Sequence, residues 1–449
     1  MICVCDIGTS SLKAGIINRE GKLVCFIKIP LQTFQPDFSA IKWEKALFDA
    51  VASFPENVRN AIEAIAVSGH GPTLVPLDKN NQPGRPLFWF DQRYKKETFS
   101  SASYFLPKIA DLKLRSPDAY SRVQIFLPCP EYLCFLLTEE KKAVIPHDGF
   151  IPYYWNDAAC AAMGIERGKL PPLTPCTAVF GRLTTAAAAA LGVPADIPVF
   201  CTGPDFLAAS LGTLAFNPGT VHVRGGTSEA VNTSCRKNDP VVMKAAKNSS
   251  LRIVPGFLSG TINIARFLPH IGRMHAFLAT LLYPGQDALH RMCVESLTAG
   301  PGARGLQFVM PEMENGELFR DISLNDCFSG GAANRSLQEY GRAFLEFAAG
   351  QIAAACRELN TIGIEIAELI AVGGLSKCHA YNVLKASFAG IPVKIPTVQD
   401  TELIGNAAVA AAGMGYFPDP QYAAKVFFKT AHTVEPDPVL AADFQNRRE

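Results

Sequence analysis

Near the start of the chain, an acid, two hydroxyls and a lysine stand close enough together to handle phosphate and metal. Asp6 ends a short apolar run, and the turn after it contains Gly8, Thr9 and Ser10 ahead of Lys13. A carboxylate suits a divalent cation, while turn N–H groups, hydroxyls and a lysine suit phosphate oxygens. The arrangement suggests nucleotide chemistry, although a plain hairpin turn capped by Asp6 would contain the same residue types.

A similar turn between two strand-like segments recurs in the second half of the chain. A turn of Gly225, Gly226, Thr227 and Ser228 follows a short apolar run and precedes another strand-like segment. Aligning the two turns on Gly8 and Gly226 puts Arg224 where Asp6 stands, so only the first copy keeps an acid for a cation. Two phosphate-binding turns with one metal-binding acid fit a nucleotide held between two domains.

Three residues further on form a candidate strip that faces a sugar. Trp89, Asp91 and Arg93 alternate along the chain, and in an extended segment alternation places all three on one face. A solvated loop anchored by one tryptophan is the alternative. The turn that contains His70 follows an expected strand at 62–68 and is aimed at the same sheet edge, where ligands bind in open α/β sheets.

Asp205 follows an expected strand at 198–202 and opens a helix at 206–211. The helix dipole favours an acid at this end, so a simple cap would explain the residue, but Gly203 and Ala208 leave room for a ligand to approach. Later, Gly373 and Gly374 follow a buried strand at 369–372, and the next helix would direct its N–H groups at a phosphate or ribose.

The elements that position these residues read as an α/β protein. An antiparallel meander covers residues 1–29, and residues 94–191 read as mostly helical. A long helix is expected over 336–361, and a helix rich in small residues over 401–413 closes the second half. The tail after Tyr416, which contains four prolines, is expected to be peripheral.

Composition limits the class of protein. The 449 residues are 48% apolar and 18% charged, which allows two or three domains with large cores. The formal net charge is +1 without a basic run, so neither nucleic acid nor membrane is an expected partner. We expect no membrane span, a cytoplasmic location and a small-molecule partner, and a homodimer stays open. Thirteen cysteines lie singly in apolar runs and read as buried free thiols.

Four segments, in this order and spacing, resemble the FGGY carbohydrate kinases over roughly residues 1–416. They are Asp6 to Lys13, Trp89 to Arg93, Gly203 to Gly212 together with Gly225 to Ser228, and Val372 to Ser376. The resemblance implies two ribonuclease-H-like domains of the actin and sugar-kinase type with a cleft between them. Residues 1–214 would form the sugar- and phosphate-binding domain, and residues 215–449 the nucleotide-binding domain with a peripheral tail.

The resemblance also implies an activity, the transfer of the γ-phosphoryl group of ATP to a hydroxyl of a small sugar, polyol or sugar acid, with Mg²⁺. Asp205 would be the general base, and Asp6 would hold Mg²⁺ through water. The nucleotide would be bound by Gly8, Thr9, Ser10, Lys13, Gly226, Thr227, Gly373 and Gly374. The sugar would meet His70, Trp89, Asp91 and Arg93. Such a role needs mainly positioning and charge neutralisation, because phosphoryl transfer has a loose transition state.

Two departures from the family pattern bear on the substrate. Xylulokinase-like members carry glutamine, methionine and histidine where this chain has His70, Gly71 and Pro72, so its sugar contacts differ. The third glycine of the adenosine-side loop is Leu375, and the chain is short for the family. Two alternatives stay open: an actin-like or chaperone-like ATPase without a sugar, and a catalytically weak, sugar-sensing relative.

Overall fold

The computed structural model describes residues 1–33, 35, 38–91, 101–226, 228–248, 250–311, 322–331 and 334–447. Contacts divide the chain into two units. Unit 1 comprises Met1–Leu214, Pro255–Thr261 and Asp400–Phe428, and unit 2 comprises Ala215–Val254, Ile262–Gln399 and Lys429–Glu449. The sequence analysis predicts that all residues after 214 belong to the second domain, whereas in the structure residues 400–428 belong to unit 1.

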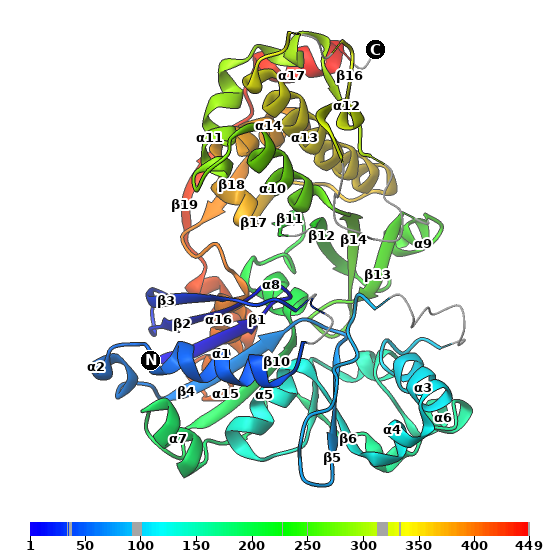
Figure 1. The fold of residues 1–449 in the computed structure, drawn as a ribbon, viewed down its shortest axis with the longest axis vertical. Helices are drawn as coiled ribbons and strands as arrows, with labels where there is room; N and C mark the ends of the chain where they lie inside the picture. The colour runs from blue at the N-terminus through cyan, green and yellow to red at the C-terminus, as the bar shows by residue number, and fades with distance from the viewer. Residues whose placement is uncertain are drawn as a thin grey trace. The chain divides into compact units, whose positions relative to one another are not determined.

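Unit 1 is built on a six-stranded sheet with the order β3-β2-β1-β4-β10-β9 (Figure 1). Its strands are β1 (Ile2–Ile7), β2 (Ser11–Ile17), β3 (Leu23–Pro30), β4 (Ala64–Gly69), β9 (Gly181–Arg182) and β10 (Pro198–Pro204). β1, β4 and β10 are parallel neighbours, and β1 to β3 form the predicted antiparallel meander. Every residue of β1 and β4 is buried, because helices cover this part of the sheet on both faces.

Two groups of helices pack on this sheet. One group is α1 (Ile41–Ala52), α5 (Cys129–Thr138) and α7 (Thr185–Leu191); the other is α8 (Asp205–Gly212), α15 (Glu402–Gly413) and α16 (Pro420–Phe427). The helices α8 and α15 approach closely through glycine. A Cβ atom added at Gly405 would lie 2.0 Å from the carbonyl oxygen of Ala208. This packing is why the small-residue helix belongs to unit 1.

Residues 101–191 are less helical than predicted. They contain α3 (Leu106–Arg115), α4 (Pro117–Arg122) and α6 (Asp157–Ala162), but also β6 (Val123–Pro128), β7 (Ala143–Ile145) and β8 (Leu173–Pro175). β6 pairs with β5 (Leu74–Asp78), and β7 pairs with β8, each outside the main sheet. Short α2 (Glu56–Arg59) precedes β4. β7 and β8 have three residues each, and β6 lies between prolines at 117, 128 and 130, so the spacing of apolar residues did not indicate these strands.

Unit 2 contains a seven-stranded sheet with the order β13-β14-β12-β11-β17-β18-β19. Its strands are β11 (Thr220–Gly225), β12 (Glu229–Arg236), β13 (Leu251–Pro255), β14 (Thr261–Leu268), β17 (Glu368–Gly373), β18 (Val393–Pro396) and β19 (Thr430–Val434). The run β12-β11-β17-β18-β19 repeats the order and directions of β2-β1-β4-β10-β9. The predicted α/β class with a duplicated, sheet-containing domain is confirmed.

The helices of unit 2 are α9 (Pro240–Ala246), α10 (Ile271–Leu282), α11 (Ala288–Glu295), α12 (Leu324–Cys327), α13 (Leu337–Ile362), α14 (His379–Ala389) and α17 (Pro438–Asn446), beside the short pair β15 (Gln307–Phe308) and β16 (Phe328–Ser329). The predicted long helix is α13. The Ser336 hydroxyl oxygen accepts a hydrogen bond from the backbone N–H of Glu339, and the Glu339 carboxylate accepts one from the backbone N–H of Ser336. Gly363 ends the helix with a φ of 106°.

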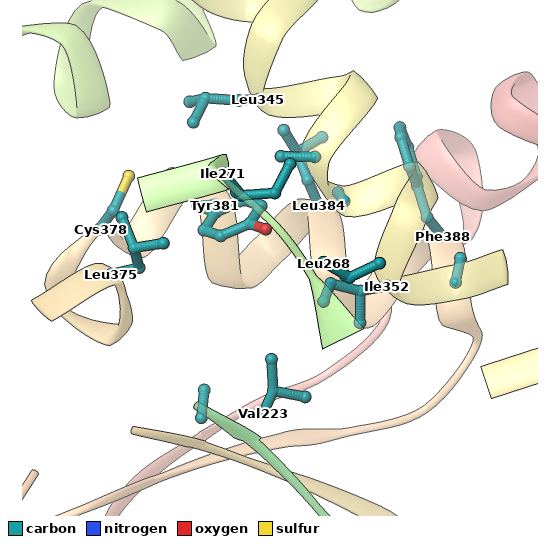
Figure 2. Close-up of a cluster of buried hydrophobic side chains, with 14 of the residues drawn as sticks. Val223, Leu268, Ile271, Leu345, Ile352, Leu375, Cys378, Tyr381, Leu384 and Phe388 are labelled. Carbon is teal, nitrogen blue, oxygen red and sulfur yellow. The ribbon is translucent and has the colours of Figure 1, made fainter. Parts of the chain in front are cut away.

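A hydrophobic core joins these helices to the sheet. Figure 2 shows side chains from α14, α13 and the end of β14, among them Tyr381, Leu384, Ile352 and Leu268, packed above Val223 of β11. β19 pairs with β18 at the edge of the unit 2 sheet and α17 packs on α14, while β19 is mostly exposed and no residue of α17 is buried, so this part of the tail lies at the margin of unit 2. No helix within the described ranges combines the length and apolar character that a membrane crossing needs.

One disulfide contradicts the prediction that all cysteines are free. It joins Cys293 of α11 to Cys378, which directly precedes α14, with the two Cα atoms 5.5 Å apart. The two residues are 85 positions apart in the chain, and only the packing of α11 against α14 brings them together. Spacing along the sequence therefore contained no signal for this pair.

Candidate active site

The carboxyl ends of three neighbouring parallel strands meet at one edge of the unit 1 sheet. Ile7 of β1 pairs with Gly69 of β4, and Gly69 pairs with Pro204 of β10. Asp6 lies one position before this level, while His70 and Asp205 lie one position after it. Three of the predicted site residues, far apart in the sequence, are therefore brought to the same edge.

Asp6 is fully buried between β2 and β4. Its Oδ1 accepts a hydrogen bond of 2.7 Å from the Ser68 hydroxyl, and its Oδ2 has no hydrogen-bond partner. The nearest cation is the Lys13 ammonium, 3.9 Å from Oδ2. Burying a carboxylate oxygen without a hydrogen-bond donor costs free energy, which makes Oδ2 of Asp6 a candidate ligand for a cation.

The surroundings of Asp6 favour its neutral form in the ligand-free protein. Burial raises the pKa of Asp6 to about 7; the carboxylates of Glu402 and Asp205 also raise this pKa, while Lys13 and the hydrogen bond from Ser68 lower it. Negative charge concentrated at a desolvated carboxylate is what a divalent cation would neutralise. Within the described ranges, however, no group of three or more acidic, histidine or cysteine side chains could cage a metal on its own.

Lys13 is held by two acids that the sequence did not single out. Its ammonium lies 2.8 Å from Asp400, two residues before α15, and 3.8 Å from Glu402, the first residue of that helix. In the sequence both residues look like ordinary acids at a helix N-terminus, nearly 400 positions from Lys13. A signal for their role exists only in the packing of α15 on the first sheet. Asn406 of the same helix donates to the Cys5 carbonyl and to the Ser68 hydroxyl, 2.9 Å each.

The first predicted phosphate turn is a tight connection between β1 and β2. The N–H of Gly8 donates to the Ser11 carbonyl at 2.9 Å, so this amide is used by the turn itself. Thr9 and Ser10 form the tip, where Ser10 is exposed and Thr9 is half-buried. The hydroxyl of Thr9 accepts a hydrogen bond of 3.2 Å from the indole nitrogen of Trp89.

Asp205 is the first residue of α8, and the N-cap position belongs to Pro204. The strand before it contains a register shift beside Gly203, whose φ of 84° suits glycine. Asp205 acts electrostatically on Asp6 and on His70, raising the pKa of each. The residue is thus placed in the first turn of a helix, at the same edge as the other two predicted residues.

His70 is a buried, neutral side chain. Burial lowers its pKa to about 4, with a smaller opposing effect from Asp205. Its Nδ1 lies 3.0 Å from the hydroxyl of Thr73, and its ring lies 5.3 Å from that of Trp43, centroid to centroid. An aromatic surrounding of this kind explains why the imidazole does not become charged at neutral pH.

The predicted alternation of the sugar strip does not hold. The chain is extended up to Phe88, and then Trp89 and Phe90 form a turn in which the N–H of Asp91 reaches the Phe88 carbonyl at 3.4 Å. Trp89 and Asp91 therefore do not lie on one face of an extended segment. Arg93 lies outside the described residues.

In unit 2, the two predicted nucleotide loops are neighbours. Gly225 at the end of β11 pairs with Gly373 at the end of β17, and Gly226 and Gly374 follow them. Gly373 has a φ of 80°, and a Cβ atom there would lie 2.3 Å from the Gly225 carbonyl oxygen, so only glycine fits. Thr227 lies outside the described residues.

A buried polar cluster that the sequence did not reveal links these loops to α14. Glu229, which begins β12 after the second turn, accepts a hydrogen bond of 2.6 Å from the Tyr381 hydroxyl. The ammonium of Lys385 lies 4.0 Å from Glu229 and 4.2 Å from the centre of the Tyr381 ring. Burial lowers the pKa of Lys385 to about 8, and the carboxylate of Glu229 opposes that effect.

Known proteins resemble the chain along almost its whole length. The model of the N-terminal domain of the FGGY family of carbohydrate kinases matches residues 1–101 and 91–212, and that of the C-terminal domain matches residues 221–414. The xylulose kinase of Staphylococcus epidermidis is 20% identical over 96% of this chain and 92% of its own length. The autoinducer-2 kinase of Salmonella choleraesuis is 22% identical over 99% of this chain and 92% of its own length.

The fold agrees with these matches. The crystal structure of ligand-bound xylulose kinase from Lactobacillus acidophilus superposes with a TM-score of 0.80, at 18% identity, over 99% of this chain and 96% of that one. At this identity the likeness shows the fold, while the two family models cover most of the sequence. The chain therefore belongs to the FGGY family of carbohydrate kinases.

Proposed function

We propose that this carbohydrate kinase transfers the γ-phosphoryl group of ATP to a hydroxyl of a small sugar, polyol or sugar acid, with Asp205 as the general base. The observation that carries the proposal is the shared sheet edge, where Asp6, His70 and Asp205 end three adjacent parallel strands. A carboxylate for a cation, a buried polar side chain and a second carboxylate lie together there, as phosphoryl transfer to an alcohol needs.

Mg²⁺ fits the donors at this edge. The unpartnered Oδ2 of Asp6, together with the nearby Glu402, provides negative charge for a divalent cation. One or two carboxylates are enough, because Mg²⁺ in kinases keeps several waters and binds substrate phosphates. When bound, the ion would neutralise charge on the phosphates.

Asp205 would accept the proton of the attacking hydroxyl. Asp205 lies in the first turn of α8, at the end where the helix dipole is positive. The helix begins directly after β10, whose pairing with β4 shifts register beside Gly203. Orientation of that hydroxyl would fall to the neutral His70 and to residues of the Trp89–Arg93 segment.

Thr9, Ser10 and Lys13 would bind the phosphates from unit 1. The ammonium of Lys13 would contact both a phosphate and Asp400, so the phosphate would have to compete with the Asp400 carboxylate for it. In unit 2, Gly226 and Thr227 would contact phosphate, and Gly373 and Gly374 would border the adenosine. Small backbones there allow close approach of the nucleotide.

Membership of a kinase family argues against an ATPase without a sugar. The catalytically weak, sugar-sensing relative is a separate hypothesis, supported by the different residues at 70–72. Named relatives act on different compounds, so the substrate has to be found by experiment. A cytoplasmic location and a homodimer stay predictions.

Substitution of Asp205 by Asn tests the proposal. ADP release is first measured with a panel of pentuloses, polyols and aldonic acids. With the best substrate, we expect Asp205→Asn to lower turnover by something on the order of 10² to 10⁴ while ATP binding and melting temperature stay close to the parent, because Asn keeps the shape and loses the proton acceptor.

Asp157→Asn is the matched control. Asp157 is also the first residue of a helix, α6, but it is exposed and outside the proposed site. This variant should keep the parent turnover. An Asp205→Asn protein with near-parent turnover would remove Asp205 from the mechanism, and a parent without turnover on any substrate would favour the sensing relative.

A further inference from the structure

The indole of Trp89 is hydrogen-bonded to the first phosphate turn. Its Nε1–H donates to the hydroxyl oxygen of Thr9 at 3.2 Å, while the side chain as a whole is 43% exposed. The residue was predicted to meet the sugar. Its single polar hydrogen is instead committed to the residue that would bind phosphate, which leaves only the ring face for a sugar.

A second pair of contacts connects Trp89 to His70. The backbone N–H of Trp89 donates to the hydroxyl oxygen of Thr73 at 3.1 Å, and the same oxygen lies 3.0 Å from Nδ1 of His70. Thr73 is fully buried. The contacts form a continuous chain, His70 to Thr73 to Trp89 to Thr9, within unit 1.

Two of these hydrogen bonds have a fixed direction, because an N–H group can only donate. The Thr73 hydroxyl oxygen accepts from Trp89 and keeps a second lone pair and its own proton, so the donor between Thr73 and His70 is set by which ring nitrogen of His70 carries the proton. Thr9 likewise accepts from the indole. A hydroxyl has one proton, so the Thr9 proton points away from Trp89 and toward whatever acceptor the turn binds.

We infer that Trp89 is a positioning residue for the phosphate turn, whose indole N–H orients the Thr9 hydroxyl as a donor to an ATP phosphate and ties that turn to the loop that carries His70. This inference rests on the proposed function, since it takes Thr9 to contact phosphate. It adds that Trp89, predicted to contact the sugar, is hydrogen-bonded to the predicted phosphate turn.

Trp89→Phe tests the inference, because it keeps an aromatic ring and removes only the N–H donor. We expect the KM for ATP to rise about 2- to 10-fold, the effect of one hydrogen bond, while the KM for the sugar changes by less than about 2-fold. Trp89→Ala, which also removes the ring, should raise the KM for the sugar as well.

A double-mutant cycle with Thr9→Val separates orientation from packing. Val keeps the shape of Thr and lacks the hydroxyl, so in its background Trp89→Phe should have no further effect on the KM for ATP. Trp155→Phe is the matched control, since the indole of Trp155 donates to the Pro171 carbonyl at 3.1 Å in a buried place. It should lower the melting temperature and leave both KM values near the parent.

Fluorescence gives a readout that does not need turnover. The chain has three tryptophans, and Trp43 and Trp155 are buried, so a change of emission on adding Mg·ATP should come from Trp89 and disappear in Trp89→Phe. A parent that does not bind Mg·ATP would overturn the proposed function and this inference with it. A normal parent with additive Trp89→Phe and Thr9→Val effects, or with only the sugar KM changed by Trp89→Phe, would overturn this inference alone.

Discussion

Substitution of Asp6 by Asn should make the ligand-free protein more stable at neutral pH and insensitive to magnesium. Asn can keep the hydrogen bond from Ser68, which is 2.7 Å long, and it removes the charge from a side chain that is 0% exposed. The gain should depend on pH, because the folded protein holds a proton on Asp6 over a pH range in which the unfolded chain has already released it.

The magnitude follows from the pKa. Burial raises the pKa of Asp6 from 3.8 to about 7, and each pKa unit corresponds to about 1.4 kcal/mol, so ionised Asp6 costs the folded protein on the order of 4 kcal/mol. The unfolded chain releases this proton near pH 3.8 and the folded protein near pH 7. The contribution of Asp6 to stability is therefore fully present below pH 3.8 and is lost as pH rises through 7.

The measurement is urea unfolding of parent and variant between pH 4 and pH 8, in EDTA and with Mg·ATP. The free energy of unfolding of Asp6→Asn should equal that of the parent at pH 4 and exceed it by a few kcal/mol at pH 8. Mg·ATP at 100 times its Kd should stabilise the parent by about 2.7 kcal/mol, and the magnesium-dependent part should be missing from the variant.

Glu131→Gln is the control for this experiment. Glu131 is also fully buried, accepts one hydrogen bond of 3.0 Å from the Val144 N–H, and has its pKa raised to about 7 by burial. It should give the same dependence on pH with an unchanged effect of Mg·ATP. If the advantage of Asp6→Asn is the same at every pH, or if Mg·ATP stabilises it like the parent, the reasoning about Asp6 is wrong.

Two further predictions concern packing and cross-linking. Gly405→Ala should destabilise the protein by at least about 1–3 kcal/mol in urea unfolding, because its Cβ would lie 2.0 Å from the Ala208 carbonyl oxygen, whereas Gly350→Ala in α13 has room, with Phe444 3.7 Å away, and should be neutral or stabilising. Peptide mapping without reductant should find Cys293 linked to Cys378; Cys293→Ser should cost about 4–5 kcal/mol by the chain-entropy account for a separation of 85 residues, unlike Cys25→Ser at a free thiol, and an alkylated Cys378 in the unreduced parent would contradict the disulfide.

Local sequence patterns were sufficient to predict the strands that end at the candidate site residues. The turn after Asp6, its copy at Gly226 and the helix opened by Asp205 are each specified by adjacent residues, so apolar runs and turn residues located them. The roles proposed for these residues came from the resemblance to a kinase family, because the strand order alone does not indicate them.

Contacts between segments that are far apart in the chain could not be predicted from the sequence. Asp400 and Glu402 reach Lys13 only because α15 packs on the first sheet, and nothing near residue 400 indicates that placement. Trp89 was placed on an extended face, but a turn at 89–90 sends its indole to Thr9. In both cases the decisive neighbour is far away along the chain, where periodicity and spacing contain no information.

The return of residues 400–428 to unit 1 has a consequence for how the protein is made. Asn406 bonds to Cys5, 401 positions earlier, and at about 5–20 residues per second a ribosome needs roughly 20 to 80 s to synthesise the chain between them. During that interval the strands of the first sheet have been synthesised but α15 has not. The apolar surface that this helix covers in the folded protein is then exposed to solvent or bound by a chaperone. A chain released before residue 400 would lack Asp400 and Glu402, the acids that contact Lys13. It would also expose the apolar surface that α15 covers, so we expect it to aggregate.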